Sequence, residues 1–266
     1  MVEVTFAQLQ GWLVAFFWPF VRILAFFGAS PLWGHSSVPR QVKIGLALLI
    51  TVVIAPVLPP MPDIPMLSWA SFGVMIEQLL IGIAIGLVMR VTFAAVQAAG
   101  EFIGMQMGLA FATFFDASSG TNSAILSRIF YMITLLMFLA MGGHLMVLEA
   151  LIASFQGLPI GIGRFDPAAF ELLVRYGGTI FVSGMSLALP LVGSLLIINL
   201  ALGILNRSAP QLTVFNIGFP TSLTVGLILL MVLMTDISRF LARLFGNGLA
   251  FVHQLIESLA PLPPPT

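Results

Sequence analysis

Long apolar runs are the feature that most constrains how this chain can fold. One run begins near Phe72 and stays apolar to about Val96, and it continues without a proline, but more polar, to about residue 108. A helix needs about 20 mainly apolar residues to span the hydrocarbon core of a bilayer. Charged residues make up only 8% of the chain, against about 25% in a typical soluble protein. So few charges cannot cover a water-facing surface, which places the chain among integral membrane proteins.

Six apolar runs predict an all-α, polytopic integral membrane protein with about six long, kinked hydrophobic helices. The runs are Leu9–Phe27, Ile44–Leu58, Phe72–Val96 with its extension, Ile129–Phe155, Tyr176–Leu205 and Ile217–Thr235. Pro190 is expected to kink the fifth helix. The first run follows an acidic residue and no basic region, which predicts a retained helix and not a cleaved signal peptide.

A further, amphipathic helix is expected near the C-terminal end, over Asp236–Ala260. Its polar residues recur at steps of three, four or seven, which places them on one wet stripe of a helix. They are Asp236, Arg239, Arg243, Asn247, Gln254 and Glu257. Residues 261–266 (PLPPPT) are expected to form a disordered tail. Because no separate soluble domain is visible, we expect a single membrane domain over residues 1–260.

Glycines recur at four-residue spacing in and after the third run. Gly82 and Gly86 form one pair, and Gly100, Gly104 and Gly108 form a series. On a helix this spacing makes a groove in which another backbone can approach closely. A single pair can arise by chance in a chain with 25 glycines, whereas the consecutive series favours a packing face.

Charged residues in or beside the spans allow two interpretations. They are Arg22, Glu77, Arg90, Glu101 and Asp116. One interpretation is a proton relay of a pump or transporter, since an ionisable group at bilayer depth is costly and often functional. The other is ion pairing between helices or a position at a helix end. The second is favoured, because no span holds two acids at the spacing of a relay.

Catalytic and ligand-binding motifs are nearly absent. The chain has no cysteine, and His35, His144 and His253 stand alone without an HExxH pattern. GASP at residues 28–31, with His35, faintly resembles an intramembrane serine protease, but the glycine after the serine is missing. We therefore expect no enzymatic activity, no cofactor, no metal and no nucleic-acid partner.

The segment GMQMGLAFATFFDASSGTNS, at residues 104–123, departs most from an ordinary membrane helix. It is apolar and rich in glycine, and it ends in Asp116 and a polar tail. Phe111, Phe114 and Phe115 would form one aromatic cluster in a helical turn. The cluster is either a buried core turn or a constriction, because irregular backbone at membrane depth is tolerated only inside protein or along a cavity. Apolar rings can close a pore by excluding water.

Three stretches of the chain resemble the FliR family, which comprises flagellar type III export-gate proteins and is related to injectisome proteins of the SctT, SpaR and YscT type. The stretches are RILAFFGASPLWGHSSVPRQVKIGLALLIT (22–51), GEFIGMQMGLAFATFFDASSG (100–120) and LNRSAPQLTVFNIGFPTSLTVGLILL (205–230). The second is similar to the family's GLAFATFFDP-type loop, and the third to its NR-x-x-PQ-x-x-x-F-x-x-GFP stretch. Two positions depart from the family pattern, because Ala117 replaces its usual proline and Thr213 replaces a frequent asparagine.

The resemblance implies a non-enzymatic subunit that helps to form, nucleate and seal a protein-conducting channel. It implies a helical hetero-oligomer with FliP-type and FliQ-type subunits, contacts with FlhB-type and FlhA-type export proteins and with lipid, and unfolded flagellar substrates as cargo. The expected location is the bacterial inner membrane, within the flagellar basal body and partly raised toward the periplasm. Residues 1–175 would be P-subunit-like, and residues 176–260 would form a Q-subunit-like helical pair.

The resemblance also assigns roles to particular residues by motif. The pore plug would be Gly108, Leu109, Ala110, Phe111, Ala112, Thr113, Phe114, Phe115 and Asp116. A turn on the cytoplasmic side would contain Arg207, Pro210, Gln211, Phe215, Gly218, Phe219 and Pro220.

Two alternative functions stay open. One is an injectisome homologue, which sequence separates poorly from a flagellar protein. The other is a proton-coupled small-solute transporter, which would need paired broken helices, and only Pro190 indicates such a break.

Overall fold

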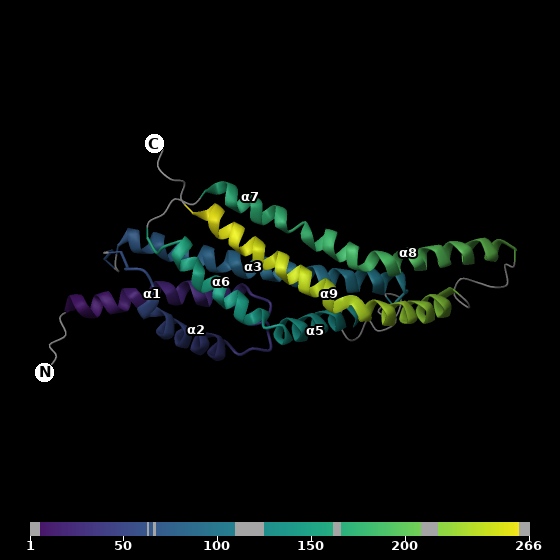
Figure 1. Ribbon diagram of the computed structural model, residues 1–266, viewed down its shortest axis with the longest axis horizontal. Coiled ribbons are helices and arrows are strands. Elements are labelled where there is room, and N and C mark those ends of the chain that lie inside the picture. Colours follow the sequence, from purple (N-terminus) through teal and green to yellow (C-terminus); the bar gives the residue numbers. More distant parts are fainter. Residues whose placement is uncertain are drawn as a thin grey trace. The chain divides into compact units, whose positions relative to one another are not determined.

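The computed structural model describes residues 6–62, 64–65, 68–109, 125–161, 166–208 and 218–260. Helices account for most of these residues, which contain no strand. In chain order the elements are α1 (Phe6–Ala29), α2 (Arg40–Ile54), the short 3₁₀ helix η1 (Ala55–Val57), α3 (Trp69–Gln106), α5 (Ile125–Ala140), α6 (Gly143–Gly157), α7 (Pro167–Tyr176), α8 (Thr179–Ser208) and α9 (Phe219–Leu259) (Figure 1). Within the described residues, five helical stretches are long and apolar enough to cross a membrane, or six if α5 and α6 together form one span. The predicted all-α membrane architecture is confirmed.

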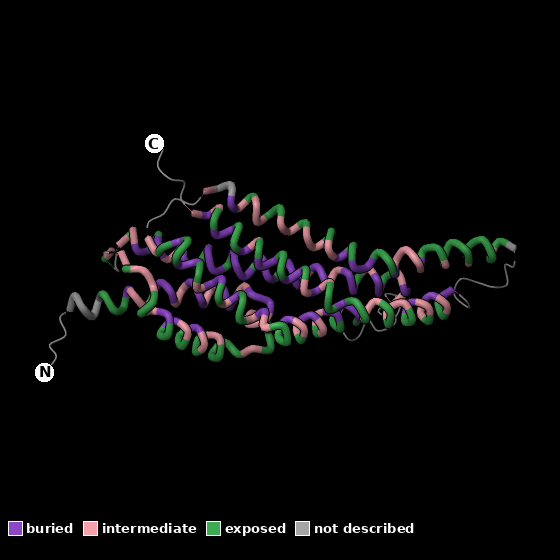
Figure 2. The backbone as a smooth tube through the Cα atoms, in the orientation of Figure 1, coloured by how far each residue is buried: buried purple, intermediate pink, exposed green. Residues whose placement is uncertain are grey.

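Two compact units divide the chain, and each is built from segments that are distant in the sequence. The first unit contains Met1–Val91, Gly142–Gly177 and Asn247–Thr266, and the second contains Thr92–Met141 and Gly178–Gly246. α3 and α9 therefore contribute to both units. α3 is the most buried of the candidate spans, whereas α2 is largely exposed (Figure 2).

The fourth apolar run does not form the single helix expected over Ile129–Phe155. α5 ends at Ala140 and α6 begins at Gly143. Between them Gly142 has a φ of 70°, a left-handed conformation that residues with a side chain rarely adopt. The expectation of one helix was wrong because the apolar pattern continues on both sides of the break, and hydrophobicity carries no information about the sign of φ.

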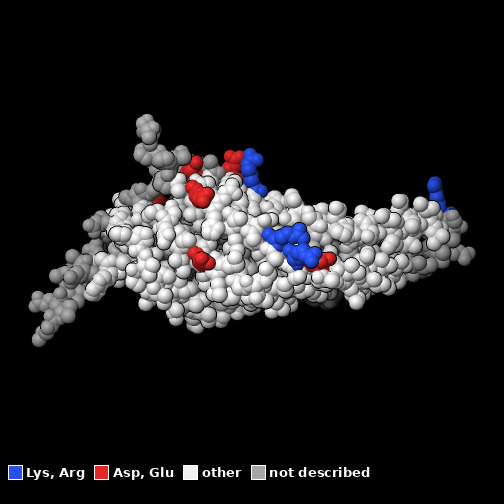
Figure 3. Space-filling model, viewed as in Figure 1, with Lys and Arg blue, Asp and Glu red and all other residues white. Residues whose placement is uncertain are grey.

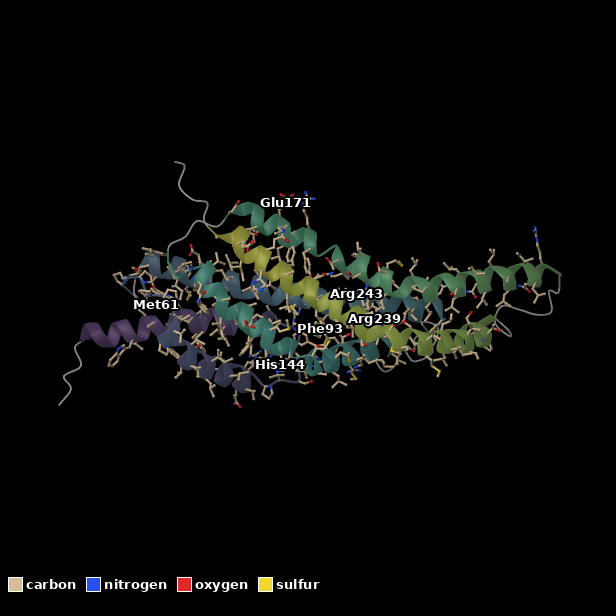
Figure 4. All side chains as sticks on the ribbon, viewed as in Figure 1. Met61, Phe93, His144, Glu171, Arg239 and Arg243 are labelled. Carbon is tan, nitrogen blue, oxygen red and sulfur yellow. The ribbon has the colours of Figure 1, made fainter. Side chains whose placement is uncertain are left out.

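The last two expected helices are one continuous helix. α9 runs for 41 residues, although the sequence predicted a spanning helix to Thr235 and a separate helix from Asp236. No glycine or proline interrupts that junction, so the helical hydrogen bonds continue through it. The predicted wet stripe is confirmed, because all six of its residues are exposed. Arg239 and Arg243 project from α9 one helical turn apart (Figure 4).

A buried arginine joins several helices in the core of the first unit. Arg22 of α1 is fully buried. Its guanidinium donates hydrogen bonds to Gln78 Oε1 of α3 at 2.8 Å, to Ser154 Oγ of α6 at 3.1 Å and to the carbonyl oxygen of Leu158 at 2.8 Å. It also lies 4.1 Å from the centroid of the Phe155 ring. Hydrogen bonds and a ring contact therefore hold the guanidinium inside the helix core. This favours a structural role for the charge over a role in a proton relay.

Two glycines bring α3 against α1 in the same unit. A Cβ atom at Gly82 would overlap the carbonyl oxygen of Arg22, and it would lie 2.8 Å from the Cβ of Ala25. A Cβ atom at Gly86 would lie 2.6 Å from the Cβ of Ala29. The two backbones can approach this closely only because α3 has no side chain at these positions.

Apolar side chains are exposed on both units. α2 of the first unit and α8 of the second carry long exposed apolar faces, which include Leu49, Val52, Val53, Phe181, Val182, Ile197 and Leu200. Figure 3 shows a face on which charged side chains form only a few small groups between wide uncharged areas. Such surfaces are suited to lipid or to protein neighbours, not to water.

Candidate functional site

The C-terminal end of α3 leads directly into the segment that the sequence singles out. α3 ends at Gln106, and Gly108 then has a φ of 80°. The N–H of Gly108 donates to the carbonyl oxygen of Met105 at 3.0 Å, and the N–H of Leu109 donates to that of Gly104 at 3.0 Å. These two bonds form a Schellman motif, in which a left-handed glycine ends a helix. Gly108 therefore sets the direction in which the chain leaves α3.

α5 packs antiparallel to the last turns of α3 within the second unit. A Cβ atom at Gly100 would lie 2.7 Å from the Cα of Ser127. The hydroxyl of Ser127 donates to the carbonyl oxygen of Gln97 at 3.0 Å. Earlier in α3, Phe93 contacts Phe138 from later in α5, with ring centroids 5.3 Å apart. The end of α3 and the beginning of α5 therefore lie together at one end of a helical hairpin.

α8 packs on α3 about three turns before its end, and α9 packs on Met107, the residue just after α3. A Cβ atom at Gly184 of α8 would lie 2.8 Å from the carbonyl oxygen of Ala95 and 3.2 Å from the Cβ of Ala98. A Cβ atom at Gly226 of α9 would lie 2.6 Å from the Cγ of Met107. Close approaches at glycines thus hold the last turns of α3 against α5, α8 and α9.

An aromatic cluster supports this packing below the end of α3. Phe93 of α3 (Figure 4), Phe138 of α5 and Phe245 of α9 are nearly fully buried. Their ring centroids lie 5.1 to 5.7 Å apart, within the range of favourable aromatic pairs. Because large buried rings resist repacking, the cluster gives the hairpin a rigid base.

The predicted plug and turn lie only partly among the described residues. Gly108 and Leu109 are described, and the other predicted plug residues, Ala110, Phe111, Ala112, Thr113, Phe114, Phe115 and Asp116, lie outside the described residues. Of the predicted turn, Arg207 lies in the last turn of α8, and Gly218, Phe219 and Pro220 lie where α9 begins. Pro210, Gln211 and Phe215 lie outside the described part of the chain.

The glycines assigned to helix packing occupy different environments. Gly100 faces the backbone of α5, whereas a Cβ atom at Gly104 would make only an ordinary contact, 3.8 Å from the Cβ of Leu126. Gly108 lies beyond α3, so its left-handed backbone, and not a helical groove, requires glycine. The sequence reasoning missed this cap, although a glycine followed by an apolar residue at the end of a helical run is its usual signal.

Alanine at Gly100 and alanine at Gly104 are expected to give opposite results. Gly100→Ala should destabilise the protein by about 1–3 kcal/mol, the usual cost of overpacking, because the new Cβ would meet the backbone of Ser127. Gly104→Ala should be neutral or stabilise α3 by up to about 1 kcal/mol, because alanine favours helix and the position has room. Thermal unfolding in detergent measures both effects. Equal melting temperatures would contradict the described contact between α3 and α5.

The described residues of this site are suited to packing and to holding the chain in position. Within the described ranges, no group of three or more His, Asp or Glu side chains could hold a metal ion. The close contacts around the end of α3 are made mainly by glycine, alanine, methionine and phenylalanine, which provide packing surfaces. The arrangement can therefore hold and aim the segment that follows α3.

Comparisons with known proteins agree on one family. Residues 13–248 match the family described as bacterial export proteins, family 1. The chain is 46% identical over 259 residues to the flagellar biosynthetic protein FliR of Escherichia coli (strain K12). This alignment covers 97% of this chain and 99% of that protein. It is 45% identical over 253 residues to the protein of the same name from Pectobacterium carotovorum subsp. carotovorum, covering 95% and 97%. For the protein of that name from Bacillus subtilis (strain 168), the identity is 31% over 245 residues, covering 91% and 94%.

Proposed function

The chain belongs to the FliR family of bacterial export proteins, and from this premise we propose that it is a non-enzymatic subunit of the flagellar type III export gate. It helps to form, nucleate and seal the protein-conducting channel, and residues 108–116 are its closing segment. It assembles with FliP-type and FliQ-type subunits beside FlhB-type and FlhA-type proteins, in the inner membrane at the flagellar basal body and partly raised toward the periplasm. Unfolded flagellar proteins are the cargo.

The observation that supports a closing segment is how the helices before and after it are held together. The chain leaves α3 at the Gly108 cap and resumes at α5, whose first turn packs on Gly100 and Gly104 of α3. The proposed closing segment thereby begins at the capped end of α3, and the chain that follows it returns to a helix that packs on α3. Phe111, Phe114 and Phe115 supply the apolar bulk that can exclude water from a pore.

The alternatives receive less support. The matched relatives carry a flagellar name, which favours a flagellar protein over an injectisome homologue. A proton-coupled transporter needs ionisable groups inside the membrane, and the only charged side chain buried among the described residues is Arg22. The division into a P-subunit-like part over residues 1–175 and a Q-subunit-like part over residues 176–260 stays a prediction.

Replacing Phe111, Phe114 and Phe115 together with alanine is expected to make the assembled gate leak small ions. The substitutions remove the apolar bulk of the closing segment but leave its helical supports intact. The measurement is ion conductance across lipid bilayers that contain the gate co-purified with its partner subunits. Recovery of the complex should equal that of the wild type, because these residues are proposed to seal and not to assemble.

The matched control for this experiment replaces exposed phenylalanines elsewhere. Phe72 of α3 and Phe181 of α8 are 51% and 68% exposed, so Phe72→Ala with Phe181→Ala removes similar side chains without touching the closing segment. Its resting conductance should match the wild type. An assembled triple variant that conducts no more than the wild type would rule out the proposed seal.

A further inference from the structure

Met107, the residue just before the cap glycine, lies across bare backbone of α9. Its side chain is only 1% exposed. A Cβ atom built on Gly226 would lie 2.6 Å from the Cγ of Met107, 2.9 Å from its Cε and 3.0 Å from its Sδ. The outer part of the thioether chain therefore occupies the space that a side chain at position 226 would need.

Both sides of this contact are fixed by their neighbours in the second unit. The N–H of Met107 donates to the carbonyl oxygen of Ile103 at 2.9 Å, so Met107 still takes part in the hydrogen bonds of α3. One turn before Gly226, the hydroxyl of Ser222 donates to Asn199 Oδ1 of α8 at 2.9 Å. α9 is thus joined to α8 close to the position where it receives Met107.

We propose that Met107 and Gly226 form a seat that positions the closing segment, which makes Met107 a positioning residue for closure. This inference rests on the function proposed above for residues 108–116. Because Gly108 is the next residue and carries the φ of 80° that turns the chain, any displacement of Met107 is passed to the entry of that segment. Methionine suits this seat, since its unbranched side chain fills irregular space.

Gly226→Ala is the substitution that tests the seat most directly. The three atoms nearest to the added methyl group would all belong to the side chain of Met107, so the substitution should displace Met107 and, with it, the turn at Gly108. The gate is co-purified with its partner subunits and placed in bilayers. Resting ion conductance should rise at least about twofold, because the weakest coupling between contacting residues shifts an equilibrium, here that between open and closed gates, by about this factor. Met107→Ala should raise the conductance by a similar factor. Adding Gly226→Ala to Met107→Ala should then have little further effect, because the side chain to be displaced is gone.

Gly203→Ala in α8 is the matched control, since nothing lies within 4 Å of a Cβ atom at that position. Its conductance should equal that of the wild type. The melting temperature of each complex is measured beside the conductance, because a merely structural contact would lower the melting temperature and leave the conductance per assembled gate unchanged.

Assembled Gly226→Ala and Met107→Ala gates that are as tight as the wild type would overturn the seat. If the Phe111/Phe114/Phe115 alanine variant leaks in the same assay, the closing segment stands and only the seat fails. If that variant is also tight, the proposed closing segment fails with it. Should Gly226→Ala not assemble, the conductance of Met107→Ala decides by the same criterion.

Discussion

Replacing Arg22 with methionine is expected to destabilise the protein by about 1–3 kcal/mol for each buried acceptor that is left without a donor, because methionine cannot donate a hydrogen bond. Gln78 Oε1, Ser154 Oγ and the carbonyl oxygen of Leu158 would lose the donor that they share. Buried acceptors without a donor carry their full desolvation cost. Because folded proteins are stable by only about 5–15 kcal/mol, little folded protein should accumulate. The measurement is the melting temperature in detergent, together with the yield from membranes.

Two further variants separate the hydrogen bonds of Arg22 from its charge. Arg22→Lys keeps the charge but replaces the planar fork with a single ammonium group, so it should recover only part of the stability. Arg175→Met is the matched surface control, because Arg175 pairs with Glu171 at 2.6 Å while its side chain is 76% exposed. Exposed pairs contribute about 0–1 kcal/mol. An Arg22→Met protein that melts with the wild type would show that these bonds do not hold the first unit together.

Alanine at Gly82 or at Gly86 is expected to force α1 and α3 apart. The new Cβ at Gly82 would meet backbone atoms of Arg22 and Phe26, and backbone cannot move aside as a flexible side chain can. Each substitution should cost about 1–3 kcal/mol or more. The double variant should cost less than the sum of the two, since the first substitution already displaces α1 and so makes room for the second. Thermal unfolding of the single and double variants measures these terms.

Gly73→Ala on the same helix is the control with the opposite expectation. Nothing lies within 4 Å of a Cβ atom at Gly73, so alanine there should be neutral or stabilise α3 by up to about 1 kcal/mol through its helix propensity. If all three alanine variants melt alike, the close approach of α1 and α3 is not what makes glycine necessary at positions 82 and 86.

Much of the helical organisation could be predicted, because it depends on local patterns. The third run was expected to continue to about residue 108, and α3 ends at Gln106. The polar stripe of α9 was identified from spacing alone, and its residues are exposed. The break at Gly142 was missed because apolar residues continue on both sides of it and φ is not visible in hydropathy.

The supports of the closing segment could be predicted only in part. The four-residue spacing of Gly100 and Gly104 indicated close packing, but it could not name α5 as the neighbour or show that the two positions differ. The cap at Gly108 was within reach of sequence reasoning, whereas the contact between Met107 and Gly226 was not. Those two residues are far apart in the chain, and neither is unusual in its own surroundings.

The amino-acid sequence by itself determined that this is an all-helical membrane protein with the motifs of an export-gate family, because hydrophobicity, spacing and motifs are local properties. Only the tertiary structure decided which helix each glycine admits and which groups satisfy Arg22, whose partners Gln78 and Ser154 lie 56 and 132 positions away. It also showed which residues hold the end of α3. The physical reason is that close packing and buried hydrogen bonds depend on atoms brought together from distant parts of the chain.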